Sequence, residues 1–338
     1  FARSNMTALF VNKSKTWNYP GSTDTTNVND FNRVGGLEYY FASKTNKITG
    51  KVFWLQSFDP QNKKGQMANA SWISYNGRKL NLYWNHEYVG ENFNAEVGYV
   101  PRKSYWRIEQ QVLYFFFPKR SRIVNHGFQL YNDNYFDLAS NNIDRVIQPG
   151  YNFNFNNTAY INFRFNNIYT YLRSEFDPTN SGGKKLADST GYIYNSGLVQ
   201  FQSNYRRSVY MYGSAEYGEY YNGKKTTLYG NLNLRIRTWG VFSSGLTIND
   251  IKLPDPYKSV TLYLWSFGTS ISFNNSLFFS SFVQYNDQIN NFNIYARLQW
   301  RFIPMSDVFL VYTDNYLTPE FSVRNRAIHL KFVYWLNM

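Results

Sequence analysis

The sequence of 338 residues contains no cysteine, which excludes disulfide scaffolds, thiolate metal sites and cysteine nucleophiles. It also lacks a long apolar run. The longest one, Val112 to Phe117, is far shorter than the roughly 20 residues that a membrane-crossing helix needs. Ala, Leu and Glu are sparse and no convincing helical periodicity is present. These absences exclude a helical membrane protein and a disulfide-rich secreted domain.

The chain begins at Phe1, with neither an initiator Met nor a signal peptide, so we expect a mature form or a fragment. No Pro/Ser-rich tract, charge block or change of composition divides it. We therefore predict one domain over residues 1–338.

Aromatic, Asn and basic residues are abundant: 29 Phe, 31 Tyr, 9 Trp, 42 Asn and a formal net charge of +13. So many aromatic residues argue against disorder. Basic residues together with aromatic ones can indicate nucleic-acid binding. Here the Lys and Arg residues are scattered along every segment and form no compact motif, so we expect no nucleic-acid partner.

Hydrophobicity alternates with a period of two in many segments, such as 151–155, 161–166, 228–237 and 292–302. This pattern is typical of strands with one apolar and one polar face. About eighteen candidate strands can be marked, with sixteen as an alternative if hairpins are merged or missed. Their ranges are 3–12, 33–43, 48–58, 67–76, 79–89, 104–117, 124–134, 146–156, 158–172, 189–204, 207–220, 225–238, 240–249, 258–272, 276–286, 290–302, 306–314 and 325–337.

Most of these candidates have at least about 10 residues, which suits the roughly 9 to 11 needed to cross a bilayer at a tilt. Long and short connections mostly alternate, as in outer-membrane barrels. The long set is Lys13–Asn32, Pro60–Gln66, Gly90–Lys103, Asn134–Arg145, Asp177–Asp188, Asp250–Tyr257 and Asn315–Arg324. Two further connections on that side, 222–223 and 287–289, are shorter than the rule expects. We predict an all-β fold, a transmembrane antiparallel up-and-down β-barrel in the bacterial outer membrane.

Strand ends carry many Tyr and Trp residues, as expected of the aromatic girdles at the two membrane interfaces. Examples are Tyr39-Tyr40, Tyr105-Trp106, Tyr169, Tyr171, Tyr220-Tyr221, Trp239, Tyr312 and Tyr334-Trp335. The predicted final strand places Ile328, Leu330 and Phe332 on one face and ends near Met338. Exposed cations such as those of Lys119–Arg122 suit anionic headgroups, although a solvated turn explains them equally. We expect outer-membrane lipid and lipopolysaccharide as partners, and leave other outer-membrane proteins open.

Three segments resemble a large outer-membrane family of Bacteroidota, whose members are described as of unknown function or as carbohydrate-binding family 9-like proteins. They are Phe93–Arg102, with the pattern aromatic-x-x-Glu-Val-Gly-aromatic, the hairpin Ala296–Tyr312, and the closing segment Ala327–Leu336. The opening segment Ala2–Phe10 also fits. In that family a β-sandwich resembling a carbohydrate-binding module precedes the barrel. This module is absent here, so the resemblance assigns no sugar-binding or catalytic residue.

A barrel of this size encloses an aqueous channel unless something fills it. The candidate lumen-lining cations are Arg107, Arg164, Arg235, Arg237, Arg297, Arg301 and Lys331. A basic lining favours anions and binds hydroxyls or phosphates. The alternative is a filled lumen, because several bulky residues are also predicted to point inward, among them Tyr229, Tyr295, Trp265 and Phe115.

No catalytic, metal or cofactor site is predicted, because no Gly-x-Ser-x-Gly or His-Glu-x-x-His motif is present. His86 and Glu87 are neighbours and so point to opposite faces of a strand. Asp133, Asp137 and Asp144 could coordinate Ca²⁺ near one loop, but such loops are common without metal. In the resembling segment, Glu96 and Arg102 suggest a loop-fixing salt bridge, with Gly98 at a tight bend.

The sequence therefore predicts a non-enzymatic outer-membrane barrel, acting as a pore or as the membrane anchor of a carbohydrate-related module. The alternative is a closed barrel subunit of a larger uptake, secretion or assembly complex.

Overall fold

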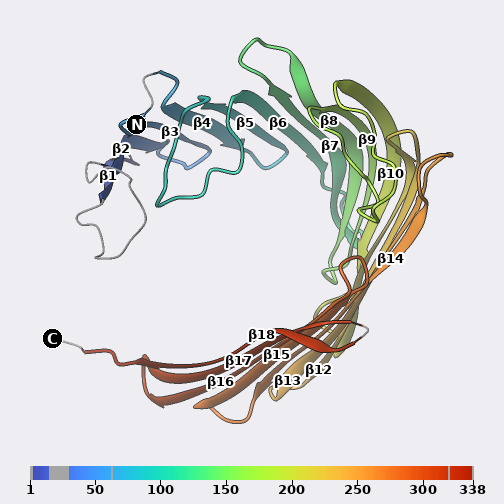
Figure 1. Ribbon diagram of the computed structural model, residues 1–338. Coiled ribbons are helices and arrows are strands. Elements are labelled where there is room, and N and C mark those ends of the chain that lie inside the picture. The colour runs from blue at the N-terminus through green and yellow to red at the C-terminus, as the bar shows by residue number, and fades with distance from the viewer. Residues whose placement is uncertain (1–2, 15–29, 62–63, 319, 337–338) are drawn as a thin grey trace.

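The computed structural model describes residues 3–14, 30–61, 64–318 and 320–336. All regular structure in these residues is β, in one sheet of eighteen strands (Figure 1). They are β1 (Arg3–Ser14), β2 (Phe31–Ala42), β3 (Ile48–Phe58), β4 (Met67–Asn76), β5 (Leu80–Val89), β6 (Tyr105–Phe116), β7 (Ile123–Phe136), β8 (Asn142–Phe155), β9 (Tyr160–Leu172), β10 (Thr190–Gln202), β11 (Val209–Tyr220), β12 (Gly223–Ile236), β13 (Gly240–Lys252), β14 (Val260–Ser272), β15 (Leu277–Asn286), β16 (Asn291–Ile303), β17 (Ser306–Leu317) and β18 (Ser322–Val333). The described residues include no helix that is long and apolar enough to cross a membrane.

Each strand pairs antiparallel with the next along the chain, from β1–β2 to β17–β18. The sheet is thus an up-and-down meander, and the predicted count of eighteen strands is confirmed. Figure 1 shows it curving into an open C. The sheet is not closed, because within the described residues no pairing joins β1 to β18.

The final strand is shorter than predicted and ends at Val333. Its partner explains the difference, since β17 begins at Ser306 and Val333 already faces Asp307. Trp335 N instead donates to Ser306 Oγ at 3.0 Å. Met338 lies outside the described residues.

Connections alternate between two edges of the sheet, called here the turn edge and the loop edge. The turn edge holds the first residue of β1, the last of β18 and the connections that follow even-numbered strands. Two connections predicted to be long, Asn134–Arg145 and Asn315–Arg324, are short, because the flanking strands extend into them. Asp137 closes the first of these by accepting from Ala139 N and Asn141 N at 2.9 and 2.8 Å. Parts of three predicted loops, residues 15–29, 62–63 and 319, lie outside the described residues.

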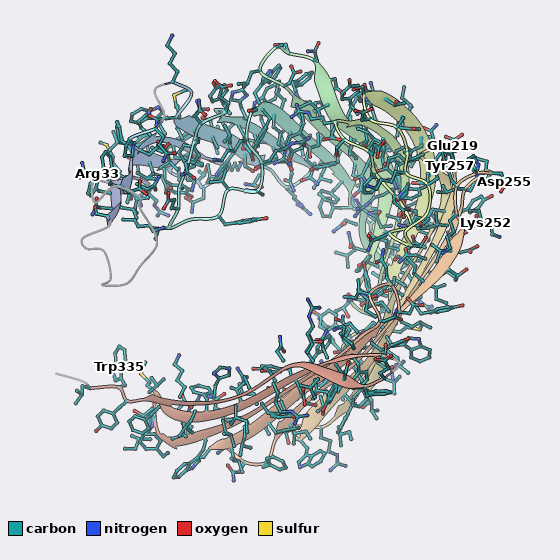
Figure 2. All side chains as sticks on the ribbon, viewed as in Figure 1. Arg33, Glu219, Lys252, Asp255, Tyr257 and Trp335 are labelled. Atoms are coloured by element: carbon teal, nitrogen blue, oxygen red, sulfur yellow. The ribbon has the colours of Figure 1, made fainter. Side chains whose placement is uncertain are left out.

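The two faces of the sheet differ in polarity. Figure 2 places the labelled Glu219 and Lys252 on the convex side of the curve. Both face Lys224 of β12 from the neighbouring strands, and Leu228 shares the face of Lys224 because side chains alternate along a strand. Residues that lie directly opposite each other in paired strands share a face, so the same assignment can be followed from strand to strand across the whole sheet. The convex face carries exposed apolar residues, including Leu37, Trp54, Ile73, Trp84, Val112, Leu130, Phe163, Phe165, Leu228, Leu232, Trp265, Phe267, Leu298, Leu310 and Leu330.

The concave face is polar, and its side chains converge and bury one another. The buried polar residues there include Asn85, Asp133, Asn152, Asn162, Asn166 and Ser196. Trp265, predicted to point inward, lies on the convex face with 53% of its surface exposed. Tyr40 and Tyr105 lie on the concave face, so only their neighbours Tyr39 and Trp106 belong to the convex surface. An apolar outside with a polar inside is the reverse of a water-soluble domain.

Candidate functional site

A cluster of ionised side chains occupies the concave wall of β5, β6 and β7. Register brings them together, because Glu87 of β5 lies opposite Arg107 of β6, and Glu109 of β6 lies opposite Asp133 of β7. Directly opposite residues share a face and have neighbouring Cβ atoms. Asn85 completes the group, since its Nδ2 donates to Glu87 Oε1 at 2.8 Å and to Glu109 Oε2 at 3.2 Å.

Arg107 is the only cation that contacts these three carboxylates within the described residues. Its Nε and Nη2 donate to the two oxygens of Asp133 at 2.7 and 2.9 Å, a bidentate pair. Its Nη1 donates to Glu87 Oε1 at 2.9 Å, and Nη2 lies 3.2 Å from Glu109 Oε2. Only 15% of the Arg107 side chain is exposed. Three carboxylates around one guanidinium leave an excess of negative charge on this wall.

Tyrosine side chains surround the cluster. Tyr105 OH donates to Glu87 at 3.1 Å, and Tyr131 OH donates to Glu109 at 3.0 Å. The Tyr135 ring lies 5.0 Å from the guanidinium of Arg107 and 5.0 Å from that of Arg102. The arrangement is a rigid, hydrogen-bonded polar wall that can offer oxygen acceptors and aromatic faces to a solute.

The remaining predicted lining residues are spread over the other strands. Arg164, Arg235, Arg297, Arg301 and Lys331 lie on the concave face by register. Arg301 pairs with Asp307 at 3.2 Å, whereas the other four make no ion pair within the described part of the chain. Arg237, by contrast, lies in the turn after β12, since that strand ends at Ile236. The unpaired cations thus lie on β9, β12, β16 and β18, away from the acidic wall.

The predicted salt bridge between Glu96 and Arg102 is wrong, because both residues have other partners. Glu96 pairs with Lys13 of β1 at 2.6 Å, and Arg102 pairs with Asp144 of β8 at 2.8 Å. Gly98 does not need a glycine-only conformation, since a Cβ there would meet only ordinary contacts at 3.5 Å or more. The two ion pairs join the loop between β5 and β6, residues 90–104, to strands on both sides of it.

This loop folds over the concave face of β1, β2 and β3 (Figure 1). Asn32, 3% exposed, holds it with two hydrogen bonds, donating to Asn94 O at 3.0 Å and accepting from Glu96 N at 3.2 Å. Phe93 is buried, and the loop together with concave apolar residues such as Val34 and Leu55 lines a groove of about 330 Å³. We define residues 90–104 as the inner loop. Its position could not be predicted from the local motif.

The longest described connection on the loop edge, residues 173–189, is organised around Asp177. Its carboxylate accepts from Thr179 N and Oγ1 at 2.9 and 2.6 Å and from Ser181 N at 3.0 Å, and also from the amides of Gly182 and Gly183. Burial raises the pKa of Asp177, but these hydrogen bonds outweigh it and hold the pKa below its usual range. The bonds to the ionised carboxylate fix the shape of the connection.

The predicted separation of His86 from Glu87 is confirmed, with His86 against Trp106 and Glu87 against Arg107 on opposite faces. The three aspartates considered for Ca²⁺ do not form one site. Asp133 binds Arg107, Asp137 closes its own turn, and Asp144 binds Arg102. Within the described ranges, no group of three or more His, Cys, Asp or Glu residues is placed to hold a metal ion.

Comparisons with known proteins leave the family open. No protein-family model matches the sequence, and no curated protein matches it.

Proposed function

We propose that this chain is a closed transmembrane β-barrel of the bacterial outer membrane whose polar interior forms a passage for small hydrophilic solutes. The observation that carries the proposal is the apolar convex face that continues across the sheet opposite a polar concave face. Such a face is stable against lipid hydrocarbon, and the strands, 10 to 14 residues long, are long enough to cross the bilayer at a tilt.

The two free edges are compatible with closure. Met6, Ala8 and Phe10 lie on the convex side of β1, and Ile328, Leu330 and Phe332 lie on that of β18. Pairing β1 with β18 would be antiparallel and would continue the apolar surface. A closed barrel also removes unpaired backbone groups, which are unfavourable in hydrocarbon.

The charge distribution supports a preference for anions. The acidic wall of β5 to β7 keeps an excess of negative charge around Arg107. Four concave cations on other strands make no ion pair within the described residues and outnumber that excess: Arg164, Arg235, Arg297 and Lys331. Unneutralised cations on a passage wall attract anions.

Single-channel conductance in a planar bilayer with a salt gradient tests the proposal. We expect a steady conductance with anion preference, and a reversal potential that moves toward zero when Arg235→Ser and Arg297→Ser are combined. Arg237→Ser is the matched control, because Arg237 lies in a turn beyond β12. Its effect should be smaller.

A folded barrel that stays silent would overturn the passage. It would support the second candidate, a barrel that acts as a membrane anchor or as a subunit of a larger complex. That candidate is favoured by the inner loop, which covers part of the concave face.

A further inference from the structure

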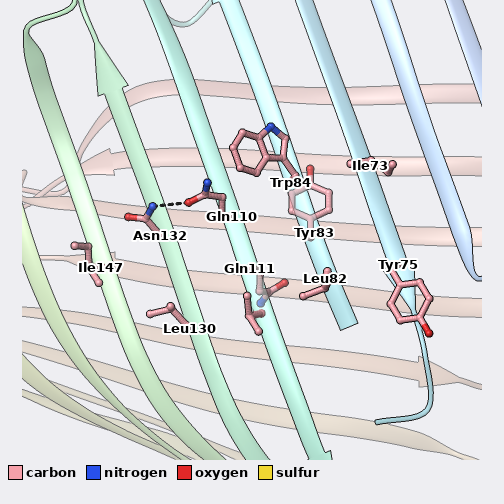
Figure 3. A pocket seen from close by; sticks show the side chains of 11 residues that line it. Ile73, Tyr75, Leu82, Tyr83, Trp84, Gln110, Gln111, Leu130, Asn132 and Ile147 are labelled. Carbon is pink, nitrogen blue, oxygen red and sulfur yellow. Dashed lines mark hydrogen bonds between the residues drawn. The ribbon is translucent and has the colours of Figure 1, made fainter. Parts of the chain in front are cut away.

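The convex face is not uniformly apolar, because polar side chains cross it on β6 to β10. Asn134 Nδ2 donates to Asn132 Oδ1 at 3.0 Å. Asn132 Nδ2 donates to Gln110 Oε1 at 2.7 Å, the bond marked in Figure 3. Farther along, Arg145 Nη2 donates to Asn167 Oδ1 at 3.1 Å, and Asn167 Nδ2 donates to Asn195 Oδ1 at 2.8 Å. We call these residues the polar row. Polar side chains facing hydrocarbon are costly and tend to be functional.

Apolar and aromatic residues flank the polar row on both sides. On β6, Gln110 lies between Ile108 and Val112 of the same face. On β9, Asn167 lies between Phe165 and Tyr169 of the same face. The polar row therefore does not simply mark the end of the apolar surface.

Two donor groups of the polar row have no acceptor within the described residues. Gln110 accepts through Oε1, but no hydrogen bond from its Nε2 is found. Arg145 uses only Nη2, and its Nε is buried without a partner. Arg145 also makes no ion pair in the described part of the chain. Because the buried Nε is out of reach of an outside ligand, an external acceptor with negative charge would bind Nη1 of Arg145 and Nε2 of Gln110.

An apolar groove of about 680 Å³ adjoins these donors (Figure 3). Its convex lining includes Ile73, Leu82, Trp84, Val112, Leu130 and Ile147, with Gln110 and Asn132 along one side. Arg145 is two residues from Ile147 on the same face, about 7 Å along the strand. Asn134 faces Arg145 across the β7–β8 pair. An extended apolar chain in the groove would thus place a polar head beside Arg145.

We propose that this groove and the adjoining part of the polar row form a binding site for one anionic phospholipid. An acyl chain occupies the groove, and the phosphate accepts hydrogen bonds from Arg145. Glycerol-ester oxygens accept from Gln110 Nε2. The inference rests on the proposed membrane insertion, and charge complementarity selects the occupant, because a guanidinium matches the geometry of a phosphate.

The test is native mass spectrometry of the full chain released from detergent micelles containing phosphatidylglycerol or, separately, uncharged diacylglycerol. We expect the wild type to retain phosphatidylglycerol in preference to diacylglycerol. Arg145→Gln should lower the retention about tenfold, as expected for the loss of a charge-assisted contact. Val112→Trp, which fills the groove while keeping an apolar surface, should also lower it.

Matched controls lie on the same convex face but outside the groove. Arg33→Gln and Val52→Trp should retain phosphatidylglycerol like the wild type. Equal retention by all variants, or equal retention of both lipids, would overturn the site.

Heat-modifiable electrophoretic mobility, which reports whether the barrel is folded, separates the lipid site from the proposed membrane insertion. A wild type that inserts as a folded barrel yet retains no phosphatidylglycerol overturns only the lipid site, whereas one that never inserts overturns both.

Discussion

At Arg107, one guanidinium contacts three carboxylates that are themselves mostly buried. The side chains of Glu87, Glu109 and Asp133 are only 24%, 17% and 11% exposed. Removing one partner of a buried ion pair leaves uncompensated charge, which costs far more than the net value of the intact pair. Arg107 is therefore the residue on the concave face at which a single change should have the largest effect on stability.

We expect Arg107→Met to lower the free energy of unfolding by about 3–5 kcal/mol, the range for breaking a buried pair. Denaturant titration of the protein in micelles measures this. Arg297→Met is the matched control, because Arg297 is also concave but makes no ion pair within the described residues. It should change the free energy by less than about 1 kcal/mol. Equal losses would show that the acidic cluster does not depend on Arg107.

Asp177 makes the connection 173–189 sensitive to acid. Its pKa is below the usual range in the folded chain, because the hydrogen bonds to its ionised form outweigh burial, which raises the pKa. The stabilisation is therefore fully present above the unfolded value of about 3.9 and is lost as the pH falls through the depressed folded value.

We expect Asp177→Asn to be less stable than the wild type near neutral pH, with the difference shrinking as the pH falls below about 4. Thermal unfolding of both proteins over a pH series measures it. Asp188→Asn, in the same connection, serves as the control. A difference that stays constant down to pH 2 would contradict the role of the ionised carboxylate.

Among the elements, the inner loop is held in part by one side chain of a distant strand. Asn32→Ala removes the two hydrogen bonds that Asn32 makes to Asn94 and Glu96. We expect the amide of Glu96 to exchange its hydrogen faster by about thirtyfold, given roughly 1 kcal/mol for each of the two hydrogen bonds. Hydrogen-exchange mass spectrometry measures this.

Asn81→Ala is a suitable control for the inner loop. Asn81 lies on the concave face of β5, near the start of the strand, whereas the inner loop follows the end of the strand. It should leave the exchange of Glu96 unchanged. If Asn32→Ala also leaves it unchanged, the loop is held by its other contacts, which are the ion pairs of Lys13 and Arg102 and the hydrogen bond from Asn94 N to Ser57 Oγ.

The strands could be predicted because period-two alternation is a local property of the sequence. Partners distant in sequence could not be predicted in this way. Glu96 pairs with Lys13, 83 positions away, and nothing near Glu96 indicates this. Arg237 was assigned to the lining because alternation continues through it, although β12 ends one residue earlier. Asp133 falls inside the predicted strand 124–134, but its pairing with Arg107 of the neighbouring strand could not be seen from the residues around it.

For the whole molecule, the central question is whether β1 and β18 pair. A face-matched pairing requires convex residues to lie opposite convex residues, and a slip by one residue would bring apolar side chains into the polar interior. The natural absence of cysteine allows this to be tested by disulfide scanning without background. We expect Ala8→Cys to form a disulfide with a cysteine at one of the convex positions 328, 330 and 332.

The expected product is an internally crosslinked monomer, seen as a shift in electrophoretic mobility that reductant reverses. Ala8→Cys with Leu37→Cys is the positive control, because these residues lie directly opposite each other in β1 and β2. Ala8→Cys with His329→Cys is the negative control, because His329 lies on the concave face. A disulfide requires Cα atoms within about 7 Å, so a signal at a convex position demands true strand pairing.

If the positive control crosslinks in the membrane while all three convex pairs stay reduced, the edges do not join. The sheet would then need another chain to cover its free strands, because unpaired backbone groups are not tolerated in hydrocarbon.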